Sequence, residues 1–142
     1  MYFDDFKVGD SFELGSVKIE RDKMMAFGRE YDPQPIHTDE SHGKDSKFGD
    51  IIAPGIMSFM SVWSGFVKSN IITDQFIAAQ SFRINWFSPV FSDDVLTGRA
   101  VIDNLVPRNP YNGMVDIRIT IFNQTGDMVM DTNTEAILAR RR

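Results

Sequence analysis

The sequence predicts an α+β fold in which an antiparallel β-sheet wraps around one long buried helix. Residues 55–68 are apolar or small around almost the whole helical circumference, which is typical of a helix buried on most sides. Residues 81–139 instead contain runs of alternating apolar and polar side chains separated by turn signals, which indicates consecutive antiparallel strands. A single apolar helix beside such a sheet loses its contact with water only if the sheet curves around it.

Before the buried helix, the sequence predicts one strand, one short helix and a long loop. Residues 11–20 alternate around a break at Gly15, which is typical of a strand with a bulge or bend. Asp22 is expected to cap a helix over residues 23–30. Residues 31–50 hold two prolines, both histidines and many charged side chains, so no regular structure is expected there. A loop of this length in a small domain is usually functional or mobile.

After the buried helix, four strands are expected, over residues 81–89, 95–106, 114–123 and 128–139. The third has the clearest pattern, because its apolar residues Val115, Ile117, Ile119 and Ile121 alternate with polar ones. One face of that strand is therefore expected to be buried. Asn112-Gly113 and residues 125–127 carry turn signals between these strands.

Length and composition fit one domain spanning residues 1–142. The absence of cysteine excludes thiolate nucleophiles, disulfides and cysteine-ligated metal sites. The net charge of −5 gives no attraction to a polyanion, so no nucleic-acid partner is expected. The N-terminus lacks the pattern of a signal peptide, and the apolar stretch of residues 51–67 is short and interrupted. A cytoplasmic protein without a membrane partner is therefore expected.

The long loop and the start of the buried helix carry the candidate chemistry. Asp32 and His37 lie five residues apart on a backbone stiffened by Pro33 and Pro35. Histidine is the side chain whose ordinary pKa suits proton transfer near neutral pH, and a carboxylate can orient or activate a water. Gly55 lies in the first turn of the buried helix, where a free amide and the helix dipole can stabilise a developing oxyanion.

These residues resemble the hydratase motif of the MaoC-like dehydratases, the (R)-specific enoyl-CoA hydratases of the hotdog fold. The resemblance rests on Phe27-x4-Asp32-x2-Pro35-Ile36-His37-x-Asp39 followed by Ile52-Ala53-Pro54-Gly55, on Phe6-x2-Gly9-Asp10, and on Phe87-Ser88-Pro89-Val90 with Asp94-x-Leu96. It covers most of the chain. Three positions depart from the family: Tyr31 stands where Gly is usual, Gln34 where Asn is usual, and Pro54 where His is frequent.

The resemblance implies a hotdog domain that adds water to a trans-2-enoyl-CoA or removes it from an (R)-3-hydroxyacyl thioester. Asp32 and His37 would act together on the water, and the Gly55 amide would hold the thioester carbonyl. The acyl chain would lie along the buried helix, in contact with Pro54, Ile56, Phe59 and Trp63. The resemblance also implies an acyl-CoA or acyl-carrier-protein thioester as substrate, no further cofactor, and a homodimer or higher homo-oligomer.

Two other functions remain open: a hotdog thioesterase that directs water at the thioester carbon, and a non-catalytic acyl-thioester-binding subunit. Asp39 is expected to cap or bond the loop, and no metal is expected at His37, Asp39 and His42, whose spacing matches no known site. One sheet around one helix leaves edge strands and an apolar flank exposed, which independently favours self-association.

Overall fold

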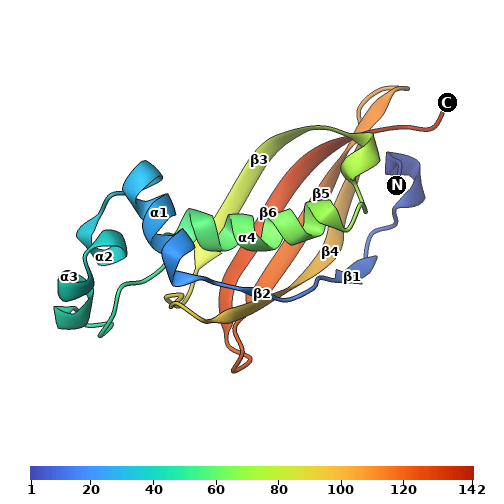
Figure 1. The fold of residues 1–142 in the computed structure, drawn as a ribbon. Coiled ribbons are helices and arrows are strands. Elements are labelled where there is room, and N and C mark those ends of the chain that lie inside the picture. The colour runs from blue at the N-terminus through green and yellow to red at the C-terminus, as the bar shows by residue number, and fades with distance from the viewer.

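The computed structural model describes residues 1–142 and contains one curved antiparallel sheet with a long helix, α4, lying across it (Figure 1). The strands run in the order β1-β4-β5-β6-β3, and β2 pairs with β4 outside this path. Their bounds are β1 Ser11–Glu13, β2 Val17–Lys18, β3 Phe76–Trp86, β4 Val95–Pro107, β5 Asn112–Phe122 and β6 Met128–Ala139. Strand β3 therefore forms one edge of the sheet, with β6 as its only partner.

Three short helices gather at the N-terminal end of α4 (Figure 1). The helical elements are η1 Phe3–Asp5, α1 Arg21–Tyr31, α2 Pro35–Thr38, α3 Glu40–Asp45, α4 Gly55–Lys68 and η2 Thr73–Gln75. None of the helices is long and apolar enough to cross a membrane. The arrangement places the segment between α1 and α4, which holds the candidate site residues, beyond one end of the sheet.

The core lies between α4 and the sheet. On β5 the four side chains from Val115 to Ile121 that were expected to face inward are fully buried, which confirms the pattern read from the sequence. Burying each such side chain contributes about 1.5–3 kcal/mol. Helix α4 is buried on one side only, because Ile56 remains 50% exposed and Met60 43% exposed. The expectation of burial on most sides was wrong, since the sheet covers only the face that it touches.

Residues 31–50 form more regular structure than expected. Helix α2 begins at Pro35, which suits a first helical position because no backbone donor is needed there. Helix α3 follows at once, and the carboxylate of Asp39 accepts from the His42 amide at 3.2 Å. The capping role expected of Asp39 is confirmed. The expectation of an irregular loop was wrong, because Pro35 can begin α2 without a backbone donor and Asp39 caps α3.

Three local assignments also differ from expectation. The strand of residues 11–20 is two short strands, β1 and β2, separated around Gly15. Helix α1 begins at Arg21, so Asp22 lies in its first turn and Glu20 is the capping residue. Asn112 and Gly113 form no turn but pair with β6, and a Cβ on Gly113 would lie 2.5 Å from the Phe3 ring. That glycine thus allows η1 to pack closely on the sheet.

Candidate active site

A cavity of about 470 Å³ opens at the N-terminal end of α4. Its lining residues are Asp32, His37, Phe48, Ile52, Ala53, Gly55, Ile56, Ser58, Trp86, Phe87, Ser88, Pro89 and Val90. They come from three regions: the segment between α1 and α4, the first turn of α4, and residues 86–90 at and after the end of β3. The size lies within the range of roughly 300–1,000 Å³ that is usual for small-molecule sites.

Close packing of α1 against α2 brings Asp32 and His37 together. Asp32 is the C-cap residue of α1, and its amide donates to the Gly28 carbonyl at 2.9 Å. A Cβ on Gly28 would lie 3.2 Å from the Cβ of His37 and 3.1 Å from Thr38 Cγ2. Because glycine lacks that atom, α2 can approach, and His37 Nε2 lies 3.3 Å from Asp32 Oδ2.

The backbone before α4 determines the orientation of the His37 ring. The imidazole is 7% exposed, and its Nδ1 lies 2.7 Å from the carbonyl oxygen of Ile52. A carbonyl oxygen only accepts hydrogen bonds, so Nδ1 must carry the proton. In the neutral ring the lone pair is therefore on Nε2, toward Asp32. The Ile52 amide donates to Ile36 at 3.1 Å, which holds this segment against α2.

The Asp32 carboxylate is held from the side opposite His37. Its Oδ1 accepts from Gln34 Nε2 at 2.7 Å, so the Gln34 departure from the family motif keeps a side-chain donor on the carboxylate. Tyr31, the other departure beside it, is the exposed last residue of α1 and packs on Phe27. Its φ is not positive, so no glycine is required there. Asp32 Oδ2 and His37 Nε2 are both acceptors, and one water can donate a hydrogen to each.

Gly55 presents a free amide to the same cavity. It is the first residue of α4, and its N–H makes no hydrogen bond within the chain. A Cβ at this position would lie 2.6 Å from both Cε2 and Nε1 of Trp86. Unless this indole moves, only glycine fits at the start of the helix. An unpaired amide at a helix N-terminus attracts negative charge on a bound ligand.

Of the four residues expected to contact the acyl chain, one lines the cavity and three do not. Ile56 lines the cavity, whereas Pro54 is buried as the capping residue of α4 and is not in the wall. Phe59 and Trp63 lie in the core, where both pack edge-on against Phe82 with ring centroids 5.7 and 5.3 Å away. Neither is in the wall of this cavity. A role for these two side chains in binding a chain stays a prediction.

Sequence reasoning did not assign Ser58, Trp86 and Phe87 to the site. Ser58 was recognisable as a small residue on an otherwise apolar helix, and it is the farthest α4 residue that lines the cavity. Trp86 and Phe87 are an aromatic pair at the end of β3, and both are exposed in the single chain. No group of three or more His, Cys, Asp or Glu side chains is placed to hold a metal ion.

The amino-acid sequence is similar to a known protein family and to individual proteins of other organisms. The chain matches the family of MaoC-like domains over residues 5–117. It is 29% identical to YdeM, an uncharacterised protein of Bacillus subtilis (strain 168), over 99% of this chain and 100% of that protein. It is 27% identical to an (R)-specific enoyl-CoA hydratase of Rhodospirillum rubrum, over 78% of this chain and 75% of the relative.

A solved structure extends the comparison to the whole fold. The crystal structure of a MaoC-like dehydratase from Rhodospirillum rubrum matches with a TM-score of 0.91 and 26% identity, over 100% of this chain and 99% of that one. The antiparallel sheet with α4 across it is thus the hotdog fold, as the sequence predicted.

Proposed function

Because the chain belongs to the family of MaoC-like domains, we propose that it is a hydratase or dehydratase of acyl thioesters. One observation carries the proposal: Asp32 Oδ2 and His37 Nε2 lie 3.3 Å apart in the cavity that also receives the free amide of Gly55. An acid–base pair for water and a donor for a carbonyl oxygen are the two things that hydration of an enoyl thioester requires. The similarity to an (R)-specific enoyl-CoA hydratase supports the same reaction.

In the proposed reaction, Asp32 and His37 share one water beside the double bond of a trans-2-enoyl thioester. One of the two side chains takes a proton as the water oxygen bonds to C3. The π electrons of the double bond move toward the thioester carbonyl, whose oxygen gains negative charge and accepts from the Gly55 N–H. A proton returned to C2 completes the addition, and the reverse sequence removes water. The side chain that took the proton from water returns it to C2, and the second member of the pair orients the water.

The proposed substrate is an acyl-CoA or acyl-carrier-protein thioester, and the reaction uses no metal or further cofactor. Acid–base addition of water changes no oxidation state of a cofactor and needs only groups that hold and move protons. Ile56 and Phe87, both apolar and both in the cavity wall, are the proposed contacts for the start of the acyl chain.

A homodimer is also proposed. The edge strand β3 and the outer side of α4 expose large apolar side chains, namely Ile56, Met60, Phe76, Ile77, Phe82 and Trp86. An edge strand with unpaired backbone groups and apolar side chains is a template for pairing with another strand. A second copy of β3, related by a two-fold axis, offers the same groups in return.

The test is hydration of crotonyl-CoA and longer enoyl-CoA substrates by the wild type, Asp32→Asn and His37→Asn. Each substitution is expected to lower kcat/KM by about 10²–10⁴-fold, the usual contribution of a general acid or base. His42→Asn, at the other histidine, is the matched control, because His42 lies in α3 outside the cavity wall. Circular dichroism and thermal melting check that each variant is folded.

Other outcomes point to other functions. Undiminished hydration in both Asp32→Asn and His37→Asn would contradict the proposal. Release of free thiol from a saturated acyl-CoA without hydration of an enoyl-CoA would identify a thioesterase. A thioester-dependent rise in melting temperature without any turnover would identify a binding subunit.

A further inference from the structure

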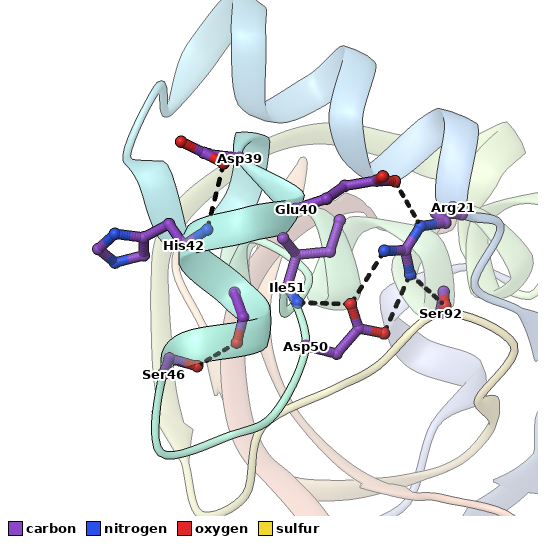
Figure 2. Close-up of polar contacts among 9 residues, drawn as sticks. Arg21, Asp39, Glu40, His42, Ser46, Asp50, Ile51 and Ser92 are labelled. Carbon is purple, nitrogen blue, oxygen red and sulfur yellow. Dashed lines mark hydrogen bonds and ion pairs between the residues drawn. The ribbon is translucent and has the colours of Figure 1, made fainter.

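Arg21 joins four segments of the chain beside the candidate site (Figure 2). Its Nη2 and Nη1 bond the two carboxylate oxygens of Asp50 at 2.9 and 3.1 Å. Its Nε bonds Glu40 Oε1 at 3.1 Å, and Nη1 also bonds Ser92 Oγ at 3.1 Å. The first residue of α1 thus contacts the segment before α4, the start of α3 and the segment between β3 and β4.

This cluster is more than an exposed ion pair. The side chains of Arg21 and Asp50 are both partly shielded from solvent, and their contact is bidentate. Bidentate arginine–carboxylate pairs are directional as well as strong, because the planar guanidinium matches the carboxylate. Hydrogen bonding to Arg21 holds the pKa of the Asp50 carboxyl below its ordinary value, and the bonds to Asp50 and Glu40 raise the pKa of Arg21. The pair of Arg21 and Asp50 therefore stays ionised near neutral pH.

The Asp50 carboxylate links Arg21 to the backbone that orients His37. Its Oδ1 also accepts from the Ile51 amide at 2.8 Å, so one carboxylate binds both the guanidinium and the segment before α4. The next residue, Ile52, supplies the carbonyl that accepts from His37 Nδ1 at 2.7 Å.

The second carboxylate acts from the other side of the histidine. Glu40 begins α3 immediately after α2, the helix that contains His37. Arg21 therefore bonds the chain on both sides of the contact between His37 and Ile52: through Asp50 on the acceptor side and through Glu40 on the ring side.

We propose that Arg21 is a positioning residue for His37. Arg21 holds the imidazole ring and the Ile52 carbonyl together, and so keeps the proton of the neutral imidazole on Nδ1. Arg21 itself is not in the cavity wall and touches no substrate. Its effect on turnover rests on the proposed hydratase function, whereas its effect on the His37 proton does not. Two measurements therefore distinguish failure of the proposed role of Arg21 from failure of the proposed hydratase function.

The first readout is ¹⁵N NMR of the imidazole nitrogens, recorded above the pKa of the ring in a His42→Asn background that leaves His37 as the only histidine. With Arg21 present, the His37 imidazole is expected to show a single tautomer, protonated on Nδ1. Arg21→Gln is expected to give a mixture of both tautomers. Arg21→Lys keeps the charge but loses the bidentate fork, so it should restore the single form only in part.

The second readout is steady-state hydration of crotonyl-CoA. Because displacement of a catalytic group by about 1 Å costs about 10²-fold, kcat is expected to fall by about 10–100-fold in Arg21→Gln. KM should change by less than about threefold, since no contact with the substrate is removed. A smaller folded fraction would also lower the apparent kcat at unchanged KM, so kcat is expressed per folded molecule, with the folded fraction measured by circular dichroism.

Arg118→Gln is the matched control. Arg118 makes a bidentate pair with Asp131 at 2.9 and 2.8 Å, and this pair joins β5 to β6 away from the cavity. Its loss should leave the His37 signals and kcat unchanged. If Arg21→Gln does not fold, Asp50→Asn replaces it, with the same expected direction.

An unchanged tautomer in the folded variant would overturn the proposal. An altered tautomer in a protein without any hydratase activity would uphold the role of Arg21 and reject the proposed function instead.

Discussion

Replacing Gly55 by alanine is expected to separate the activity of the site from the stability of the fold. The added Cβ would lie 2.6 Å from Cε2 and Nε1 of Trp86 and 3.0 Å from Cζ2, about 1 Å inside ordinary contact. The start of α4 cannot easily retreat, because the Ala53 amide just before it donates to the Val90 carbonyl at 2.7 Å. The Trp86 indole is 46% exposed, so it is the group that moves.

The expected magnitudes follow from that movement. Gly55 and Trp86 lie against each other in the cavity wall, and a shift of about 1 Å in that wall should lower kcat/KM by about 10²-fold. Stability should change by less than about 1 kcal/mol, because alanine improves helix propensity by about 0.5–1 kcal/mol while the indole loses some packing. Activity and stability are therefore predicted to respond very differently to one methyl group.

The assay combines enoyl-CoA hydration, urea unfolding and tryptophan fluorescence. The chain has two tryptophans, so a Trp63→Phe background isolates the emission of Trp86, which should move to longer wavelength as the ring enters solvent. Gly65→Ala is the control on the same helix, because a Cβ there meets no heavy atom within 4 Å. It should leave activity unchanged. Full activity in Gly55→Ala with an unmoved indole spectrum would refute the reasoning.

Three further predictions concern stability and assembly. Thr134→Val should raise the free energy of unfolding by about 1 kcal/mol in urea titrations, because the buried Thr134 hydroxyl has no hydrogen-bond partner. Bonding to Arg21 lowers the pKa of Asp50, so this pair stabilises the fold fully above the unfolded carboxyl pKa of about 4 and less as the pH falls through the folded value. Thermal melts should therefore show the wild type losing its advantage over Asp50→Asn in acid; a constant difference would contradict this. Ile77→Arg on the edge strand β3 should convert a dimer to monomers in sedimentation, whereas a wild-type monomer at micromolar concentration would reject the dimer itself.

Elements with a strong local period were predictable from the sequence. The bounds of α4 and of β6 agree with those expected, and the inward residues of β5 are buried. In β5 the alternation of apolar and polar residues records which side faces the core, so no distant information is required there. The spacing of Asp32 and His37 likewise predicted a pair in one loop, and the structure places their side chains 3.3 Å apart.

Elements that depend on neighbours were not predictable in the same way. Helices α2 and α3 have four and six residues, too short for a hydrophobic period to be recognised. Asn112-Gly113 has the composition of a turn, yet it begins β5 and pairs with β6, and the glycine instead makes room for the Phe3 ring. The lining of the cavity by Trp86 depends on the end of β3 lying beside the start of α4.

The sequence by itself determined the fold class, the long helix and the residues suited to acid–base chemistry, because these properties reside in local period, composition and spacing. Only the tertiary structure decided what orients those residues. Arg21 meets partners 19, 29 and 71 positions away, and the tautomer of His37 depends on a carbonyl 15 positions away. Such contacts form only when the folded core brings distant segments together, and no local pattern records them.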